Sequence, residues 1–353
     1  MRAKSFNSSE NCFVLNTGHK IPAVGLGTWQ ADGDICTEAV RTALEVGYRH
    51  LDCDHLYGNE VEVGQALSEA LRGGLKREDV FVTSKLWCTT NAPKRVETSV
   101  KVCLKNLELS YLDLYLVHWP LTFSFGDATD PPRKPGMELR QPSHRLKATW
   151  QAMECLVEKG LVNSIGVSNF SIQQIEELLS FAKIIPAVNQ VELHPFWRQD
   201  DLVKFCQAKG IHVSAHTPLG VPASNLLSNE CGSSGEDECE TPRIAFRRCR
   251  SVHVPMIKTS VVANIAARLN KTPEQVILRW GLQRGTSVLP RSLRPERIKT
   301  NFDIFNWSLS EEDWKKINSL EPQLRLIDSG YSNISEAGPL QAVQETDDDI
   351  EGI

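Results

Sequence analysis

The sequence lacks the features that mark membrane, secreted and nucleic-acid-binding proteins. It has no run of about 18 uninterrupted apolar residues, which a membrane-spanning helix needs. Its polar beginning, Met1 to Cys12, has no apolar stretch of the kind found in a secretion signal. Basic residues are not in excess, since 39 Lys and Arg face 44 Asp and Glu. We therefore expect a cytoplasmic protein that binds neither membrane nor nucleic acid.

Paired cysteine motifs are also missing. The ten cysteines are scattered without a CxxC pair, which in a long chain without a secretion signal indicates reduced thiols, mostly in the core. Cys231, Cys239, Cys249 and His253 lie near one another, but their spacing matches no familiar zinc pattern. We predict no metal site.

A glycine-rich dinucleotide loop is absent as well. Gly25-Leu26-Gly27 is not followed by a third glycine, because Gln30 stands there, and the segment does not link a strand to a helix. This excludes a Rossmann fold, so any dinucleotide must bind in another way.

What the chain does have is an alternation of two periods. Of its 353 residues, 41% are hydrophobic and 24% charged, as in a folded domain. Short β-branched or aromatic runs alternate with segments whose apolar residues recur at helical spacing. The predicted strands are Tyr48–Cys53, Val80–Leu86, Leu112–His118, Val162–Ser168, Ala187–Leu193, His212–Ala215, Ser287–Leu289 and Asp303–Phe305.

Eight such strands with intervening helices close more naturally into a barrel than into an open sheet, because a barrel has no edge. We predict an α/β fold, a (β/α)8 TIM barrel over about residues 13–322, in a single domain of residues 1–353. Helices are expected before Gly47, behind Pro93 and behind Ser171. Phe13–Leu15 and Lys20–Val24 predict a β-hairpin over the N-terminal mouth.

Three segments without periodicity are predicted loops: 121–145, 221–255 and the C-terminal loop and acidic tail 323–353. The first two are expected at the C-terminal face, over strands three and six, where they would determine specificity. Segment 221–255 includes Arg243–Arg250 with four arginines. It is either a phosphate clamp or, as we favour, a disordered surface insertion. Arg247–Ser251 also matches a weak kinase motif.

Polar side chains stand at the ends of three consecutive predicted strands: Asp52 with Tyr57 just beyond it, then Lys85, then His118. When hydride reduces a carbonyl, the alkoxide must be protonated as it forms. Tyrosine alone, with a pKa of about 10, is a weak acid. A Lys85 ammonium would lower the pKa of Tyr57, and Asp52 would keep that lysine charged. His118 would donate a hydrogen bond to the carbonyl oxygen.

Each of these residues also has a structural interpretation. Asp52 and Lys85 would form an ion pair, His118 would be a hydrogen-bonded core histidine, and Tyr57 would pack in a loop. The coincidence of all four at strand ends favours the catalytic interpretation.

Several motifs from Phe13 to about Arg325 resemble the aldo-keto reductase family. They are Gly47-Tyr48-Arg49-His50-Leu51-Asp52, Tyr57-Gly58-Asn59-Glu60, Ser84-Lys85-Leu86-Trp87, Leu114-Tyr115-Leu116-Val117-His118-Trp119-Pro120, Gly166-Val167-Ser168-Asn169-Phe170, Asn189-Gln190 and Leu289-Pro290-Arg291-Ser292. The resemblance implies a TIM-barrel oxidoreductase that reduces small aldehydes or ketones with NADPH, Tyr57 being the general acid. We expect a monomer.

The resemblance also implies binding residues. Ser168, Asn169 and Gln190 would hold the nicotinamide carboxamide with neutral groups. The other expected cofactor contacts are Thr28, Trp29, His216, Thr217, Leu219, Arg291, Ser292, Arg297 and Asn301. Arg291 and Arg297 suit a ribose phosphate, which favours NADPH over NADH; without the motif they would be surface charges. Trp29, Trp87, Trp119 and His118 would line the substrate pocket.

Four positions depart from the family pattern. Asp54 replaces alanine, and we expect it to turn to solvent rather than approach the site. His216 replaces a stacking tyrosine and is expected to titrate near neutral pH. Arg291 replaces lysine, and Thr300 replaces a glutamate that meets adenine.

Three alternative functions remain. Ala215-His216-Thr217-Pro218 resembles sugar-phosphate reductases of the family. The long insertion and acidic tail would also suit an NADPH-binding regulatory subunit without turnover. A metal- or phosphate-dependent barrel isomerase fits the motifs poorly.

Overall fold

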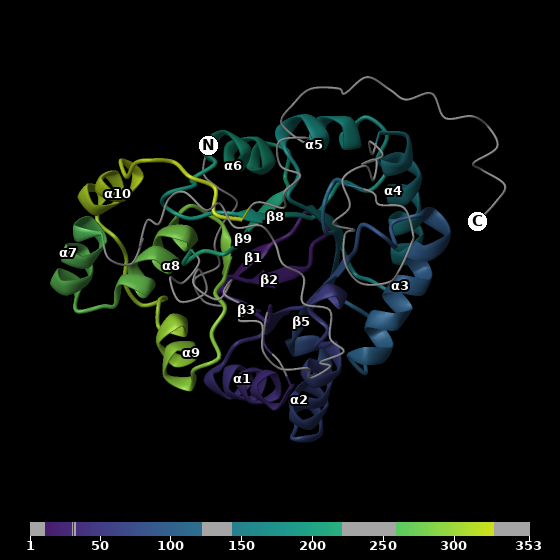
Figure 1. Cartoon of the computed structure of the whole chain (residues 1–353), viewed down its shortest axis with the longest axis horizontal. Helices are drawn as coiled ribbons and strands as arrows, with labels where there is room; N and C mark the ends of the chain where they lie inside the picture. Colours follow the sequence, from purple (N-terminus) through teal and green to yellow (C-terminus); the bar gives the residue numbers. More distant parts are fainter. Residues whose placement is uncertain (1–10, 30, 32, 122–142, 221–258, 328–353) are drawn as a thin grey trace, which may run out of the picture.

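One sheet of eight strands forms the centre of the structure, a computed structural model that describes residues 11–29, 31, 33–121, 143–220 and 259–327. The parallel strands are β3 (Leu26–Gly27), β4 (His50–Asp52), β5 (Phe81–Leu86), β6 (Leu114–Val117), β7 (Ile165–Ser168), β8 (Val188–Glu192), β9 (His212–His216) and β10 (Ser287–Leu289). The ring closes because Val24 bridges Val288 and Gly27 N donates to Pro290 O at 3.1 Å. The predicted TIM barrel is confirmed (Figure 1).

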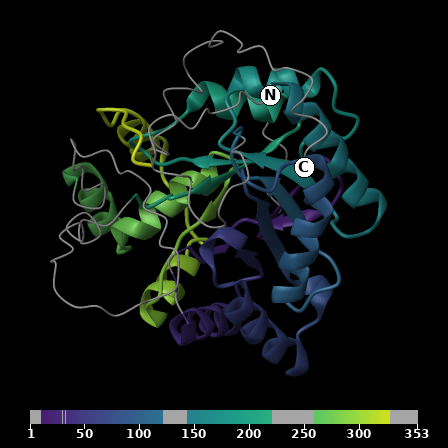
Figure 2. The same cartoon turned by 45° about the vertical axis from the view of Figure 1, so that its right-hand side comes forward.

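Helices surround the barrel, as Figures 1 and 2 show. They are α1 (Gly33–Val46), α2 (Glu60–Arg72), α3 (Pro93–Asn106), α4 (Ser143–Glu158), α5 (Ile172–Leu179), α6 (Asp200–Ala208), α7 (Ser260–Leu269), α8 (Pro273–Gln283), α9 (Pro295–Phe302) and α10 (Glu311–Asn318), with 3-10 turns η1 (His55–Tyr57) and η2 (Arg77–Asp79). The three helices predicted from Gly47, Pro93 and Ser171 are α1, α3 and α5. Ser171 and Gln174 form a capping box that begins α5.

One predicted strand is wrong. Asp303–Phe305 follows α9 without strand pairing, and the eighth barrel strand is instead β3. A two-residue strand that contains a glycine has almost no β-propensity signal, so it escaped prediction. Asp52 therefore lies on the second barrel strand. The loops expected over strands three and six follow the fourth and seventh strands, and residues 122–142 and 221–258 within them lie outside the described residues.

The predicted hairpin is present as β1 (Cys12–Val14) and β2 (Lys20–Pro22), which pair antiparallel. Its turn contacts residues that precede barrel strands: Thr17 Oγ1 lies 2.9 Å from Ser164 Oγ, and Asn16 Nδ2 donates to Pro186 O at 3.0 Å. The Phe13 ring packs against His212 at the start of β9, with centroids 4.9 Å apart. The hairpin thus covers the N-terminal mouth, as expected.

Neutral polar groups fill the barrel near this mouth. His50 Nε2 lies 2.9 Å from Thr83 Oγ1, and His212 Nε2 lies 3.0 Å from Ser287 Oγ. Burial lowers the pKa of His50 to about 4 and that of His212 to about 3. Both imidazoles are therefore neutral at neutral pH.

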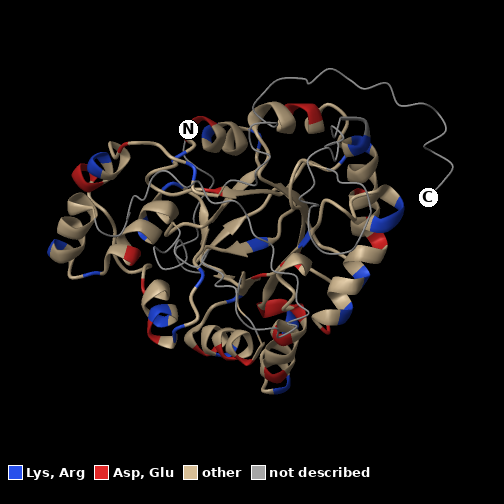
Figure 3. Cartoon of the chain, viewed as in Figure 1, with Lys and Arg blue, Asp and Glu red and all other residues tan. Residues whose placement is uncertain are grey.

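Charged side chains lie mainly on the outer helices. Figure 3 shows both signs interspersed along α2, α3 and α10. One example is the ion pair of Lys316 with Glu312 on α10, at 2.6 Å. Among the described residues, none of the helices combines the length and apolar character needed to cross a membrane.

Candidate active site

Tyr57 is placed by a tight turn that follows β4. Asp54 caps this turn, because its Oδ1 accepts a hydrogen bond from Leu56 N at 2.7 Å. Gly58 ends it with φ 69°, a conformation that a side chain would strain. Asn59 Nδ2 then donates to Thr28 O and Ala31 O, both at 2.8 Å, which ties the turn to the loop after β3.

Lys85 joins Asp52 to Tyr57 at the C-terminal end of the barrel. Its Nζ donates to Asp52 Oδ2 at 3.0 Å, to Cys53 O at 2.9 Å and to the Tyr57 hydroxyl at 3.3 Å. The other Asp52 oxygen accepts from Gln190 Nε2 at 2.7 Å. Lys85 is fully buried, so all three of its donor bonds are made inside the protein. The expected cluster is present.

The pKa of Tyr57 differs from the expectation. Burial raises it above its ordinary value, and the Asp52 and Asp54 carboxylates add to this, while Lys85 lowers it only in part. Burial alone would lower the pKa of Lys85, but Asp52, Tyr57 and Asp54 together raise it above its ordinary value. At neutral pH the site therefore holds a protonated phenol beside a charged ammonium.

The expectation that Asp54 turns to solvent is wrong. Its side chain is fully buried, and its Oδ2 lies 2.6 Å from His118 Nδ1. The i, i+2 alternation of an extended chain predicts the side of the sheet on which Asp54 lies, and a partner on that side holds it inward. His118 is buried beside the rings of Trp87 and Trp119, whose centroids are 5.2 and 6.1 Å from its own.

A neutral polar network lies at the ends of β7, β8 and β9. Asn169, with φ 62°, donates from Nδ2 to His118 O and to Ser168 Oγ, both at 3.1 Å. Ser168 Oγ donates to Gln190 O at 2.8 Å. The structure thus brings together Ser168, Asn169 and Gln190, which the sequence suggested would hold a carboxamide.

His216 belongs to the same network, but the expectation that it titrates near neutral pH is wrong. Burial, assisted by the electrostatic effects of His118, Lys85 and Arg325, lowers its pKa well below the ordinary value. Its Nε2 lies 3.0 Å from Asn169 Oδ1, and its Nδ1 lies 3.1 Å from Thr217 Oγ1. Because the Asn169 oxygen only accepts, the proton is on Nε2 and the Thr217 hydroxyl donates to Nδ1.

Most of the remaining expected cofactor residues lie in two places, at the loop after β3 and around α9. Thr28 Oγ1 donates to Asp52 O at 3.0 Å, and Arg291 Nε donates to Trp29 O at 2.9 Å, so Arg291 lies against the loop after β3. Ser292 is buried before α9, whereas Arg297 is exposed and Asn301 buried on that helix. The remaining residues of interest are Leu219, half-buried after β9, and Thr300, whose hydroxyl donates to Glu296 O at 2.7 Å within α9.

Trp87 and Trp119 form a small apolar cluster with Cys88 and Leu121, separate from the main core. The Arg325 guanidinium lies 6.0 Å from the Trp119 ring centroid. Sequence reasoning missed Arg325, because it stands in a tail without periodicity. The one sequence signal for Arg325 was that it is a basic residue within the predicted C-terminal loop.

Glu192 at the end of β8 was also missed. Its two carboxylate oxygens accept hydrogen bonds from Leu326 N at 2.6 Å and Ile327 N at 2.7 Å, and Oε1 lies 2.9 Å from His194 Nε2. These bonds bring the C-terminal segment to the face where the site lies, which explains how Arg325 reaches Trp119.

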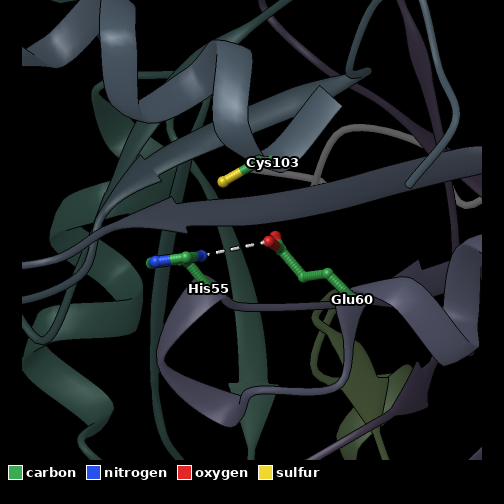
Figure 4. Close-up of side chains that lie close together, drawn as sticks. All are labelled: His55, Glu60 and Cys103. Atoms are coloured by element: carbon green, nitrogen blue, oxygen red, sulfur yellow. Dashed lines mark hydrogen bonds and ion pairs between the residues drawn. The ribbon is translucent and has the colours of Figure 1, made fainter. Parts of the chain in front are cut away.

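A second cluster, His55, Glu60 and Cys103, has the residue types of a metal site (Figure 4). Glu60 is already satisfied, because Ser84 Oγ donates to it at 2.8 Å and Asn106 Nδ2 at 3.3 Å. Burial raises the pKa of the Cys103 thiol well above its ordinary value, which disfavours the thiolate that metals bind. We interpret this cluster as a structural hydrogen-bond network.

Comparison with known proteins decides the family. The model of the Aldo/keto reductase family matches residues 23–322. The chain belongs to this family. Aldo-keto reductase family 1 member A1 of Bos taurus is 42% identical over 320 residues, which cover 90% of this chain and 91% of that protein. Aldo-keto reductase family 4 member C11 of Arabidopsis thaliana is 40% identical over 335 residues, 94% of this chain and 96% of that protein.

A solved structure agrees with the sequence relatives. The aldose reductase from Schistosoma japonicum superposes with a TM-score of 0.75 at 39% identity, covering 88% of this chain and 93% of that one. This aldo-keto reductase is therefore an oxidoreductase that acts on small carbonyl compounds. The assignment disfavours the alternatives of a regulatory subunit without turnover and of an isomerase.

Proposed function

We propose that this aldo-keto reductase reduces aldehydes or ketones with NADPH, and that Tyr57 is the proton donor. The observation that carries the proposal is Lys85 Nζ, buried between the Asp52 carboxylate and the Tyr57 hydroxyl. A monomeric, cytoplasmic enzyme in one domain is part of the same proposal.

The residues present fit a nicotinamide cofactor phosphorylated on its adenosine ribose. Ser168, Asn169 and Gln190 offer neutral donors and acceptors, as a carboxamide requires. Arg291 and Ser292, just before the N-terminus of α9, offer charge-assisted and backbone hydrogen bonds to a phosphate. The Arg291 contact to Trp29 O links this end to the loop beside the catalytic residues.

When bound, the cofactor would supply the hydride that reduces the carbonyl carbon. Tyr57 donates its phenolic proton to the carbonyl oxygen as negative charge develops there. Lys85 stabilises the phenolate that remains, and Asp52 keeps Lys85 in place. Trp87 and Trp119 exclude water from one side of the site, and His118 orients the carbonyl.

The proposal is tested by the kinetics of NADPH and NADH oxidation with a panel of aldehydes, ketones, sugars and sugar phosphates. We expect turnover with some carbonyl compounds and a preference for NADPH. No oxidation with any member of the panel would contradict the proposal.

A second candidate is reduction of sugar phosphates. It is favoured by Arg325, a cation beside the Trp119 wall, together with Ala215-His216-Thr217-Pro218. Comparing a sugar with its phosphate ester in the same panel distinguishes the two, since this candidate predicts a higher kcat/KM for the ester.

A further inference from the structure

Asp54 is a buried carboxylate that the chemistry described above does not use. It follows Asp52 by two residues on extended backbone, with φ −158° and ψ 138°. Its Oδ1 is taken by Leu56 N, and its Oδ2 lies 2.6 Å from His118 Nδ1. Among the described residues, neither Asp54 Oδ2 nor His118 Nδ1 makes a hydrogen bond of good geometry, so the contact between them is a close N···O approach of ion-pair type. A buried charge without a partner is strongly destabilising, so the contact with His118 is what makes Asp54 tolerable there.

The electrostatics of the pair agree with this geometry. Burial alone would raise the pKa of Asp54, but the adjacent His118 ring, then Lys85 and the Leu56 N–H, hold it below its ordinary value. Asp54 is therefore ionised at neutral pH. An ionised carboxylate only accepts hydrogen bonds, so the facing Nδ1 of His118 carries a proton.

A proton fixed on Nδ1 changes what the other ring nitrogen can do. In a neutral imidazole protonated on Nδ1, Nε2 has a lone pair and can only accept, so it would repel a carbonyl oxygen. In the imidazolium both nitrogens donate. With Asp54 in place, His118 can orient a carbonyl oxygen only while its ring is charged.

The charges around His118 allow that state. Titratable groups reach its surroundings from several elements: Asp52 and Asp54 at the end of β4, Tyr57 on η1, Lys85 on β5, His216 on β9 and Arg325 in the C-terminal segment. Asp52 pairs with Lys85, and Asp54 pairs with His118. The carboxylates of Asp52 and Asp54 therefore offset the charges of Lys85 and of a protonated His118, while Arg325 adds a further positive charge and Tyr57 and His216 are neutral.

We propose that Asp54 is a positioning residue that holds a proton on His118 Nδ1, so that His118 presents a charged Nε2–H donor to the carbonyl oxygen. The inference rests on the proposed function, because it requires a carbonyl for His118 to orient. It adds that carbonyl reduction declines as pH rises and the imidazolium loses its proton.

The kinetic test compares kcat/KM against pH for the wild type and Asp54→Asn. In the variant, Oδ1 keeps the bond to Leu56 N and the amide Nδ2 faces His118 Nδ1, so a neutral ring carries its proton on Nε2. We expect the alkaline decline to vanish or to move by at least about one pH unit. Near pH 6 we expect kcat/KM to be about tenfold lower, because a neutral donor replaces a charged one.

The matched control is Asp34→Asn, the same chemical change at an exposed position on α1. Its pH profile should match the wild type, and thermal unfolding should show that Asp54→Asn is folded. Coincident profiles for the wild type and a folded Asp54→Asn would overturn the inference.

A second readout needs no turnover and no variant of Asp54. Nitrogen NMR of the ¹⁵N-histidine-labelled protein, with the His118 signals identified by their loss in His118→Asn, reports the ring protons directly. We expect protons on both nitrogens of wild-type His118 at pH 6; a proton on Nε2 alone would overturn the inference. If the ring is as expected but no carbonyl is reduced, the proposed function fails while the Asp54–His118 pairing stands.

Discussion

The two mouths of the barrel bury polar groups in different ways. At the N-terminal mouth, neutral imidazoles form hydrogen bonds with hydroxyl groups: His50 with Thr83, and His212 with Ser287. At the C-terminal mouth, the Lys85 ammonium pairs with the Asp52 carboxylate, and the Asp54 carboxylate lies against the His118 ring. Buried charges are costly and rarely improve on apolar packing, so they persist where chemistry uses them. The first mouth mainly stabilises the fold, and the second carries the reaction.

The largest effect is expected from removing the central cation. Lys85→Met leaves the buried Asp52 carboxylate with Gln190 but no cation, and should lower the free energy of unfolding by about 3–5 kcal/mol. It should also abolish measurable reduction. Urea unfolding and NADPH oxidation check both.

Lys101→Met is the matched control, because Lys101 is exposed and pairs with Glu97 within α3 at 2.7 Å. It should change the unfolding free energy by less than about 0.5 kcal/mol. A Lys85→Met protein as stable as this control would show that the buried charges are not paired as described.

The N-terminal mouth should respond to pH through stability. The pKa of His50 is about 4 in the folded chain and about 6.5 when unfolded. Between these values the unfolded chain binds more protons, so stability falls as pH falls through this window. From pH 7 to pH 5 His50 should account for a loss of about 2 kcal/mol. His50→Gln should reduce the fall in unfolding free energy by that amount.

His19→Gln, at an exposed position in the hairpin turn, provides the comparison. It should leave the pH dependence of urea unfolding unchanged. Equal slopes for His50→Gln and the wild type would contradict a neutral buried His50.

The smallest effect is expected where the hairpin meets the barrel. Thr17→Ala removes the hydroxyl that lies 2.9 Å from Ser164 Oγ, and should cost about 1 kcal/mol of stability. Because the bond is at the N-terminal mouth, kcat/KM should not change. A loss of kcat/KM without a loss of stability would contradict the assignment of a structural role to the N-terminal mouth and a catalytic role to the C-terminal mouth.

The sequence predicted those parts of the molecule that local patterns determine. Hydrophobic runs such as Val80–Leu86 and caps such as Ser171 predicted strands and helices, because periodicity and capping are local. β3 was missed because its pairing with β4 depends on barrel closure rather than on its own two residues. Asp303–Phe305 has strand-like composition, but β3 already completes the ring beside β10.

The candidate site divides in the same way. Asp52, Tyr57, Lys85 and His118 were predictable because parallel strands end at one face. The partners of Asp54 and His216 were not, since each is held by a side chain from a distant part of the chain, His118 and Asn169. Such contacts also determine the protonation states. The predictions that Asp54 faces solvent and that His216 titrates near neutral pH were wrong for this reason.

The most direct test of the account is Tyr57→Phe, measured as kcat/KM for the best carbonyl substrate of the panel together with urea unfolding. The hydroxyl is the proton donor at the catalytic mouth, so kcat/KM should fall by about 10²–10⁴-fold. The free energy of unfolding should stay close to that of the wild type, because the phenyl ring keeps its packing. Retention of most of the wild-type activity would contradict the account.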